Sequence, residues 1–155
     1  MATVRVQRED FDAAAEARLL CAGRADIGAL VTFVGLCRDE GGRLASLEIE
    51  HYEGMAETEM ARVAAEAEAR WPLIGVTIVH RFGDIPAGAQ IVLVVAASAH
   101  RGDAFAAADF LMDYLKSRAP FWKRALLPDG TTEDWVAAKQ SDAIAAARWS
   151  KVSAR

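Results

Sequence analysis

Long β-prone runs separated by single helical segments are the feature that most constrains the fold of this chain. Residues 76–80 and 91–97 are rich in valine and isoleucine, and the Pro-Ala-Gly turn at 86–88 between them predicts a hairpin. Residues 27–36 form another apolar run, followed after a Gly-containing turn by the alternating segment 44–51, which predicts a second hairpin. Hairpins that alternate with single helices indicate the α+β class with a largely antiparallel sheet.

Helical patterns lie between these strands, and proline marks two of their ends. Residues 55–70 are dense in Ala, Glu and Arg without internal Gly or Pro, so we expect a helix that ends near Trp71-Pro72. Residues 101–118 end in the same way before Ala119-Pro120. Further elements are expected as helices at 12–21 and 141–149, the latter with Ser141 as its N-cap, and as strands at 3–7 and 121–126.

The length of 155 residues fits one globular domain. We assign residues 1–150 to it and expect 151–155 to be a disordered tail. No apolar run approaches the roughly 18 residues that span a bilayer, and the charged N-terminal segment lacks the apolar stretch of a signal peptide. Cys21 and Cys37 are too few for a disulfide framework or a four-ligand zinc site. The sequence therefore predicts a cytoplasmic protein without a structural metal.

The overall charge argues against binding to polyanions. Lys and Arg number 18 against 22 Asp and Glu, a net charge of −4, so we expect neither nucleic-acid nor membrane-surface binding. Residues 100–124 depart from this average, because Lys116, Lys123 and Arg124 gather around the end of one helix and the strand after it. Such a group is either a solvated face or a local cationic site.

Two segments favour a cationic site. His100 and Arg101 follow Ser98 where a β-prone run ends and a helix begins, and free N–H groups at a helix start favour a phosphate. Alternatively, Ser98 caps the helix and His100 makes a structural hydrogen bond. In the second segment, two aromatic residues lie between Lys116 and Lys123 and can desolvate an ammonium, lowering its pKa; these rings can equally be core anchors.

The long β-prone run ends at a second arginine. Arg38 lies in a Gly-containing turn, from which it can project into a cleft, and Cys37 beside it is either a thiolate nucleophile or, more simply, a small buried thiol. Glu48, Glu50 and His51 alternate along the next segment and indicate a solvent-facing edge strand rather than a metal site. The P-loop, G-x-G-x-x-G, H-E-x-x-H and G-x-S-x-G motifs are absent.

Longer motifs surround these residues and resemble one family, the large, catalytic subunit of molybdopterin synthase in molybdenum cofactor biosynthesis. The motifs follow the family's order between residues 28 and 149. They are GALVTFVG at 28–35 with Arg38-Asp39, EHYEGM at 50–55, RWPL at 70–73, HRFG at 80–83 with PAG at 86–88, SAHR at 98–101, and MDYLKSRAPFWKR at 112–124.

The resemblance implies an enzyme that inserts two sulfurs into cyclic pyranopterin monophosphate to make the dithiolene of molybdopterin. A small ubiquitin-like partner would carry the sulfur as a thiocarboxylate on its C-terminal Gly-Gly and thread that tail into the large subunit. Two large subunits would form a homodimer within a heterotetramer, with no cofactor or metal. The implied fold is an α/β hammerhead with an additional antiparallel β-subdomain.

Carried over by position, the family's substrate pocket falls on Leu36, Cys37, Arg38, His100, Arg101, Lys116, Lys123, Arg124 and Ala125. Lys116 and Lys123 are the candidate catalytic residues, one stabilising an oxyanion and the other acting as acid or base. Two positions depart from the family: Cys37 replaces a common Val or Thr, and Ala125 stands where Glu is usual. The second departure puts in doubt the need for a carboxylate there.

Helix length predicts that this pocket is composite. If Arg101 and Lys116 lie on one continuous helix, 15 residues at about 1.5 Å each separate them by roughly 22 Å, too far for one small ligand. We therefore expect His100 and Arg101 to come from the neighbouring large subunit, opposite Arg38, Lys116 and Lys123.

Two rival hypotheses remain. The first is a non-catalytic homologue that binds a phosphometabolite or serves as a scaffold, with Ala125 as its best support. The second is nucleic-acid binding through residues 116–124, with Phe121 and Trp122 stacking on bases, although the overall charge is unfavourable.

Overall fold

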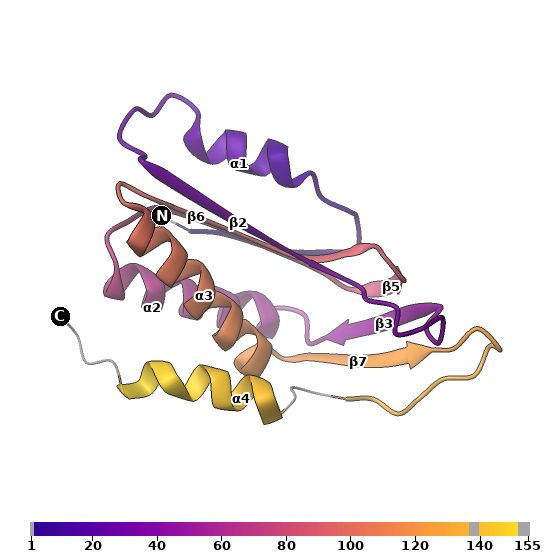
Figure 1. The fold of residues 1–155 in the computed structure, drawn as a ribbon. Helices are drawn as coiled ribbons and strands as arrows, with labels where there is room; N and C mark the ends of the chain where they lie inside the picture. Colours follow the sequence, from indigo (N-terminus) through magenta and orange to yellow (C-terminus); the bar gives the residue numbers. More distant parts are fainter. Residues whose placement is uncertain (1, 137–139, 152–155) are drawn as a thin grey trace.

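The computed structural model describes residues 2–136 and 140–151, which form two β-sheets and four α-helices (Figure 1). The strands are β1 (Ala2–Gln7), β2 (Ala29–Leu36), β3 (Ser46–His51), β4 (Leu73–Arg81), β5 (Gly83–Pro86), β6 (Gln90–Ser98) and β7 (Phe121–Leu126). The helices are α1 (Ala13–Cys21), α2 (Met55–Arg70), α3 (Arg101–Arg118) and α4 (Gln140–Ala147), which is followed by the 3-10 helix η1 (Arg148–Lys151). The α+β class is confirmed, and α2 and α3 have the predicted bounds.

The larger sheet has the strand order β1-β4-β6-β2, and the smaller has the order β5-β3-β7. Among the strands that the structure describes, only β1 and β4 run parallel and every other pair is antiparallel, so the expected antiparallel character and the additional antiparallel sheet are confirmed. The hairpin expected from residues 27–36 and 44–51 is wrong, because β2 pairs with β6 while β3 lies in the other sheet. The connection between β2 and β3 is longer than a tight hairpin loop and allows the chain to change sheets.

The second expected hairpin is correct in its pairing but not in its connection. Strands β4 and β6 are antiparallel neighbours, as predicted, yet the chain between them also forms β5, which pairs with β3 in the smaller sheet. Strand β3 is paired on both sides, with β5 and with β7, so the expectation of an edge strand at Glu48–His51 is also wrong. The smaller sheet is thus assembled from three segments that are far apart in the sequence (Figure 1).

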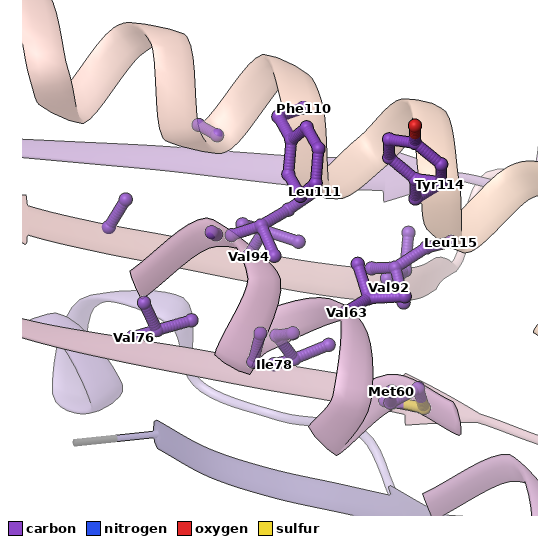
Figure 2. Close-up of a cluster of buried hydrophobic side chains, with 14 of the residues drawn as sticks. Met60, Val63, Val76, Ile78, Val92, Val94, Phe110, Leu111, Tyr114 and Leu115 are labelled. Carbon is purple, nitrogen blue, oxygen red and sulfur yellow. The ribbon is translucent and has the colours of Figure 1, made fainter. Parts of the chain in front are cut away.

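The two central strands of the larger sheet are buried on both faces. Alternate side chains point to opposite faces of a strand. One set, which includes Val76, Ile78, Val92 and Val94, faces α2 and α3. Figure 2 labels these residues together with the helix residues that they pack with: Met60, Val63, Phe110, Leu111, Tyr114 and Leu115. The other set, Val79, Leu93 and Val95, packs with Phe11 under α1. Burial on both faces explains why the sequences of these strands are mostly apolar.

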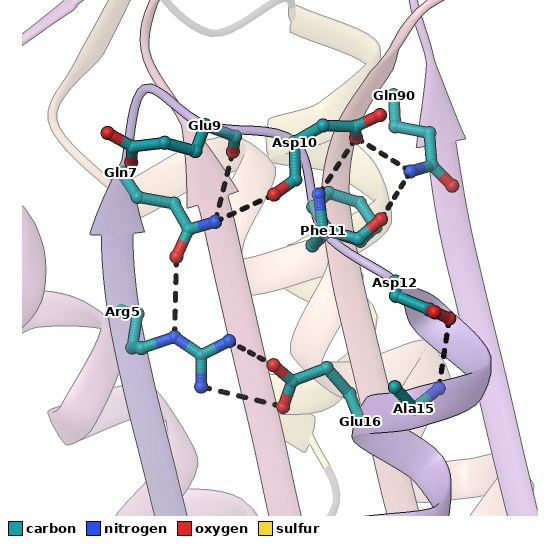
Figure 3. A network of polar contacts seen from close by, with 9 residues as sticks. All are labelled: Arg5, Gln7, Glu9, Asp10, Phe11, Asp12, Ala15, Glu16 and Gln90. Carbon is teal, nitrogen blue, oxygen red and sulfur yellow. Dashed lines mark hydrogen bonds and ion pairs between the residues drawn. The ribbon is translucent and has the colours of Figure 1, made fainter.

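Polar contacts fix α1 to the first strand and to β6 (Figure 3). The Asp12 carboxylate caps the helix by accepting a hydrogen bond from the Ala15 N–H at 3.0 Å. Arg5 on β1 forms an ion pair with Glu16 on α1. Gln90 at the start of β6 donates to the Asp10 carboxylate at 2.7 Å, and this hydrogen bond lowers the pKa of Asp10.

The C-terminal elements pack against α3. Arg148 forms ion pairs with Asp109 and Asp113, and the Trp149 indole N–H donates to the Asp113 carboxylate at 2.6 Å. Helix α4 begins at Gln140, so Ser141 lies inside the helix and is not its N-cap. Of the expected tail, Lys151 ends η1, while residues 152–155 lie outside the described residues. Within the described chain, no helix is long and apolar enough to cross a membrane.

Candidate active site

A cavity of about 940 Å³ lies where the two sheets meet, beside the last turn of α3. The end of β2 and the loop after it, parts of β3 and β4, the start of β6, β7 and the loop of residues 127–136 also line it. Its basic side chains are Arg38, Arg43, Lys116, Lys123 and Arg124, and its acidic side chains are Glu40, Glu133 and Asp134. Basic residues outnumber acidic ones, so the cavity is cationic although the chain as a whole is acidic.

Most of the site residues predicted from sequence line this one cavity. They are Leu36, Arg38, Lys116, Lys123, Arg124 and Ala125. These residues come from β2, from the loop after it, from α3 and from β7. The fold therefore brings together the basic groups that lie far apart in the sequence.

The two lysines come from consecutive elements that both line the cavity. Helix α3 ends at Arg118, and the Phe121 N–H donates to the Ala119 carbonyl at 2.8 Å as β7 begins. Lys116 is exposed on the last turn of α3, whereas Lys123 is half-buried on β7. The cavity thus has one exposed and one half-buried lysine.

The two arginines of the cavity are held differently. The side chain of Arg38 is 77% exposed and is paired only with Glu40 among the described residues. Arg124 is fixed by Glu48, whose carboxylate accepts a hydrogen bond from Nε at 2.8 Å and forms an ion pair with the guanidinium at 2.7 Å, and the guanidinium lies over the Trp135 ring at 4.5 Å. Arg38 can therefore reorient toward a ligand, while Arg124 contributes a fixed charge.

Cys37 does not line the cavity, although it adjoins Arg38. It is 1% exposed, and its backbone N–H donates to the Ala89 carbonyl at 2.7 Å. Burial raises the pKa of the Cys37 thiol, which keeps it protonated at neutral pH. These observations favour the buried-thiol interpretation over a thiolate nucleophile.

His100 and Arg101 lie at the opposite end of α3 from Lys116 and do not line the cavity. Both are exposed, and neither side chain has a partner within residues 2–136 and 140–151. His100 itself is the N-cap of α3, so the alternative in which Ser98 caps this helix is wrong. The Ser98 hydroxyl is buried and donates to the Pro72 carbonyl at 3.0 Å.

Gly28 holds this end of α3 against the start of β2. Its N–H donates to the Ser98 carbonyl at 3.0 Å, and a Cβ at position 28 would lie 2.1 Å from the Ala99 carbonyl oxygen. Only glycine fits so close an approach of two backbone segments. The contact sets the position of His100, the residue after Ala99.

His80 and Glu133 are cavity residues that the sequence interpretation missed. His80 is 7% exposed, and its ring stacks on the Phe121 ring with 3.7 Å between centroids and 15° between planes. Burial lowers its pKa to about 3, so the imidazole is neutral. The available signal for His80 in the sequence was a polar residue near the end of a mostly apolar strand.

The Glu133 N–H donates to the Ala125 carbonyl at 3.0 Å, which places a carboxylate-bearing residue beside Ala125.

No group of three or more His, Cys, Asp or Glu side chains within the described part of the chain could hold a metal ion. Of the residues weighed for such a site, Glu48 is paired with Arg124, and the His51 ring lies 3.9 Å from the Glu57 carboxylate.

Residues 6–118 match the family model of the MoaE protein. The chain belongs to the MoaE family. The molybdopterin synthase catalytic subunit of Mesorhizobium japonicum is 63% identical over 151 residues, which cover 97% of this chain and 95% of that protein. The MoaE structure from Burkholderia ambifaria has a TM-score of 0.84 at 49% identity, covering 98% of this chain and 100% of that one. The molybdopterin synthase structure from Staphylococcus aureus has a TM-score of 0.76 at 29% identity, covering 84% and 94%.

Proposed function

We propose that this chain is the catalytic subunit of a molybdopterin synthase, which transfers two sulfurs to cyclic pyranopterin monophosphate and forms the dithiolene of molybdopterin. Relatives with this name match nearly the full length of the chain at high identity. The observation that carries the proposal is the cationic cavity, in which Lys116 and Lys123 converge beside Arg38 and Arg124. This set of groups suits a substrate that carries a phosphate and passes through an oxyanion.

In this proposal the lysines do the chemistry and the arginines bind. Lys116 stabilises the oxyanion that develops when the substrate meets the thiocarboxylate, and Lys123 acts as acid or base in opening the cyclic phosphate and losing water. Arg38 and Arg124 bind phosphate and pterin together with His100 and Arg101. The thiocarboxylate is already an activated sulfur donor, so the transfer needs no metal or cofactor.

The pocket is completed by a second copy of the chain. Strand β2 is an edge strand of the larger sheet, and it carries the exposed side chains Leu30, Phe33 and Leu36. The start of β2 adjoins Ala99, the residue before His100, while its end reaches the cavity. Antiparallel pairing of β2 with β2 of a second copy across a twofold axis would carry that copy's His100 toward this cavity and bury the apolar edge.

A small sulfur-carrier protein is the second partner. The relatives are named catalytic subunits, which implies a companion subunit in those proteins. The proposed companion is ubiquitin-like and inserts a C-terminal Gly-Gly thiocarboxylate tail into the cavity, and two copies of each chain form a heterotetramer. We place this complex in the cytoplasm, because both cysteines of the chain are free thiols, which is typical of a reducing compartment.

The rival functions have weaker support. A non-catalytic homologue was suggested by Ala125, but Glu133 lies beside that position and lines the same cavity. Base stacking would need free aromatic rings, whereas the Phe121 ring is covered by His80 and the Trp122 ring packs edge-on against Tyr52 at 4.8 Å. The observations thus favour the synthase over both alternatives.

A sulfur-transfer assay tests the proposal. The purified chain is mixed with thiocarboxylated small subunit and cyclic pyranopterin monophosphate, and the dithiolene product is quantified together with the spent carrier. We expect two carriers consumed for each product molecule. Binding of both the carrier and the substrate without product would instead support the non-catalytic homologue.

A further inference from the structure

His80 has a buried, fixed position in the wall of the cavity that no role proposed above uses. It is the penultimate residue of β4 and pairs with Val6 of β1 and Val92 of β6. The Phe121 ring covers one face of the imidazole, at 3.7 Å between centroids. Strand pairing on both sides and a stacked ring leave this side chain little freedom to move.

The hydrogen bond of His80 determines which ring nitrogen carries the proton. Nδ1 lies 2.7 Å from the Arg81 carbonyl oxygen, which can only accept a hydrogen bond. Nδ1 must therefore carry the proton and donate it. Because burial keeps the ring neutral, with a pKa of about 3, Nε2 is left as an unprotonated acceptor.

This acceptor opens into the cavity. Among buried side-chain nitrogen and oxygen atoms of the described residues, only Ser46 Oγ and His51 Nδ1 lack a hydrogen-bond partner. Nε2 of His80 forms no hydrogen bond with any residue that the structure describes either, and because it is absent from this set of buried atoms it is not fully buried. The ring lines the cavity, so Nε2 is accessible from the cavity side.

Lys123 is the cavity cation best placed to use this acceptor. Phe121 and Lys123 are two residues apart on β7, so their side chains point to the same face, and both line the cavity. The charges that act on His80 come from Lys123 on β7, from Lys116 on α3 and from His51 on β3, with Lys123 the strongest of the three. A neutral imidazole beside these cations attracts an ammonium, whereas a protonated one would repel it.

We propose that His80 is a positioning residue whose Nε2 accepts a hydrogen bond from the ammonium group of Lys123 and holds it in the cavity during turnover. The inference rests on the catalytic role proposed above for Lys123. The hydrogen bond stabilises the charged form of that lysine and fixes the direction of its proton.

Three substitutions separate the two ring nitrogens. His80→Gln places an oxygen acceptor close to the position of Nε2, and His80→Asn keeps a donor close to that of Nδ1 without this acceptor. His80→Phe retains only the stacked ring. We expect His80→Gln to keep kcat within about threefold of the wild type, whereas His80→Asn and His80→Phe lower kcat about tenfold with little change in KM.

The pH profile provides a readout that a purely structural role would not move. Loss of the acceptor lowers the pKa of the Lys123 ammonium, so the basic limb of the kcat profile should move to lower pH in His80→Asn and His80→Phe but not in His80→Gln. His51→Asn is the matched control, because His51 also lies beside Phe121, with 6.0 Å between ring centroids, but does not line this cavity. An unchanged basic limb in His80→Asn would overturn the proposal.

Nitrogen NMR of the wild-type chain tests the same inference without activity or a variant. We expect His80 to remain in the Nδ1–H form from pH 5 to 9 and Nε2 to show the shift of a hydrogen-bonded acceptor. Detection of the Nε2–H form would refute the inference even if sulfur transfer occurs. Failure of the wild-type chain to transfer sulfur, with the Nδ1–H form present, would count against the catalytic role of Lys123 rather than against the geometry of His80.

Discussion

Arg101 and Lys116 lie at opposite ends of one unbroken helix, α3, which spans Arg101–Arg118. At about 1.5 Å per residue this places them roughly 22 Å apart, and only Lys116 lines the cavity. If one ligand contacts both kinds of residue, two copies of the chain must contribute to each pocket.

Mixed dimers test this arrangement. His100→Ala and Lys116→Ala chains should each be inactive alone, but a dimer with one of each has one pocket in which both residues are intact. Random mixing should therefore restore about a quarter of wild-type turnover. Mixing His100→Ala with Arg101→Ala is the control and should restore nothing, because every pocket then carries one defect. Absence of recovery in the first mixture would exclude a composite pocket.

Replacement of either lysine should impair chemistry more than binding. We expect Lys116→Ala and Lys123→Ala each to lower kcat by about 100-fold, because each removes a charge aimed at the developing transition state. Affinity for the small subunit, measured by calorimetry, should change less than twofold. Arg18→Ala, an exposed residue on α1 outside the cavity, is the control for general charge loss. Weaker partner binding with unchanged kcat would argue against these roles.

Gly28→Ala should destabilise the chain and disturb the start of α3. Its Cβ would meet the Ala99 carbonyl oxygen at 2.1 Å, so the backbone must shift, at a cost of about 1–3 kcal/mol in the free energy of unfolding. Gly102→Ala is the matched control, because no atom lies within 4 Å of its added Cβ, and it should be neutral or slightly stabilising. Urea unfolding of both variants distinguishes a local clash from a general effect of alanine.

Cys37 should react slowly and be dispensable for turnover. Burial raises the pKa of its thiol, so little thiolate exists at pH 8, whereas Cys21 is only partly buried. Mass spectrometry after brief treatment with iodoacetamide should find Cys21 modified before Cys37. We expect Cys37→Ala to retain kcat within about threefold and to lose about 1–2 kcal/mol of stability through the small cavity it leaves. A folded but inactive variant would reinstate Cys37 as a reacting group.

His80 should make stability depend on pH below neutrality. Its pKa is about 3 in the folded chain and near 6.5 when unfolded, so below pH 6.5 the unfolded chain binds a proton that the folded chain does not. Its stabilising contribution is therefore complete above pH 6.5 and is lost as the pH falls toward 3. Between pH 7 and 5 the loss should reach up to about 2 kcal/mol in urea unfolding. His80→Phe should remove this part of the pH dependence, and an unchanged dependence would show that other groups cause it.

Local sequence signals predicted the helices well and the strand connections poorly. Proline at 72 and at 120 ends α2 and α3 at the expected residues, because each signal acts on its immediate neighbours. Strand β5 was missed, since Gly83–Pro86 is only four residues long and ends in proline. The pairing of β2 with β6 rather than β3 depends on contacts between segments more than fifty residues apart, which no local pattern encodes.

The candidate site was predicted in part for the same reason. Basic residues such as Lys116 and Lys123 stand out in the sequence as departures from an acidic average. His80 does not, because its significance comes from the ring of Phe121, which follows it by some forty residues and reaches it only through the smaller sheet. Glu133 likewise gains its place beside Ala125 from a backbone hydrogen bond between a strand and a loop.

The double burial of β4 and β6 determines where this binding site could change its specificity during evolution. Neither strand has a face with room for larger side chains, since one face packs under α1 and the other under α2 and α3. The part of the cavity wall that they form is therefore nearly invariable in shape. New ligand preferences would have to arise in the loop of residues 127–136 and at the end of β2, where side chains are exposed and substitutions cost little stability.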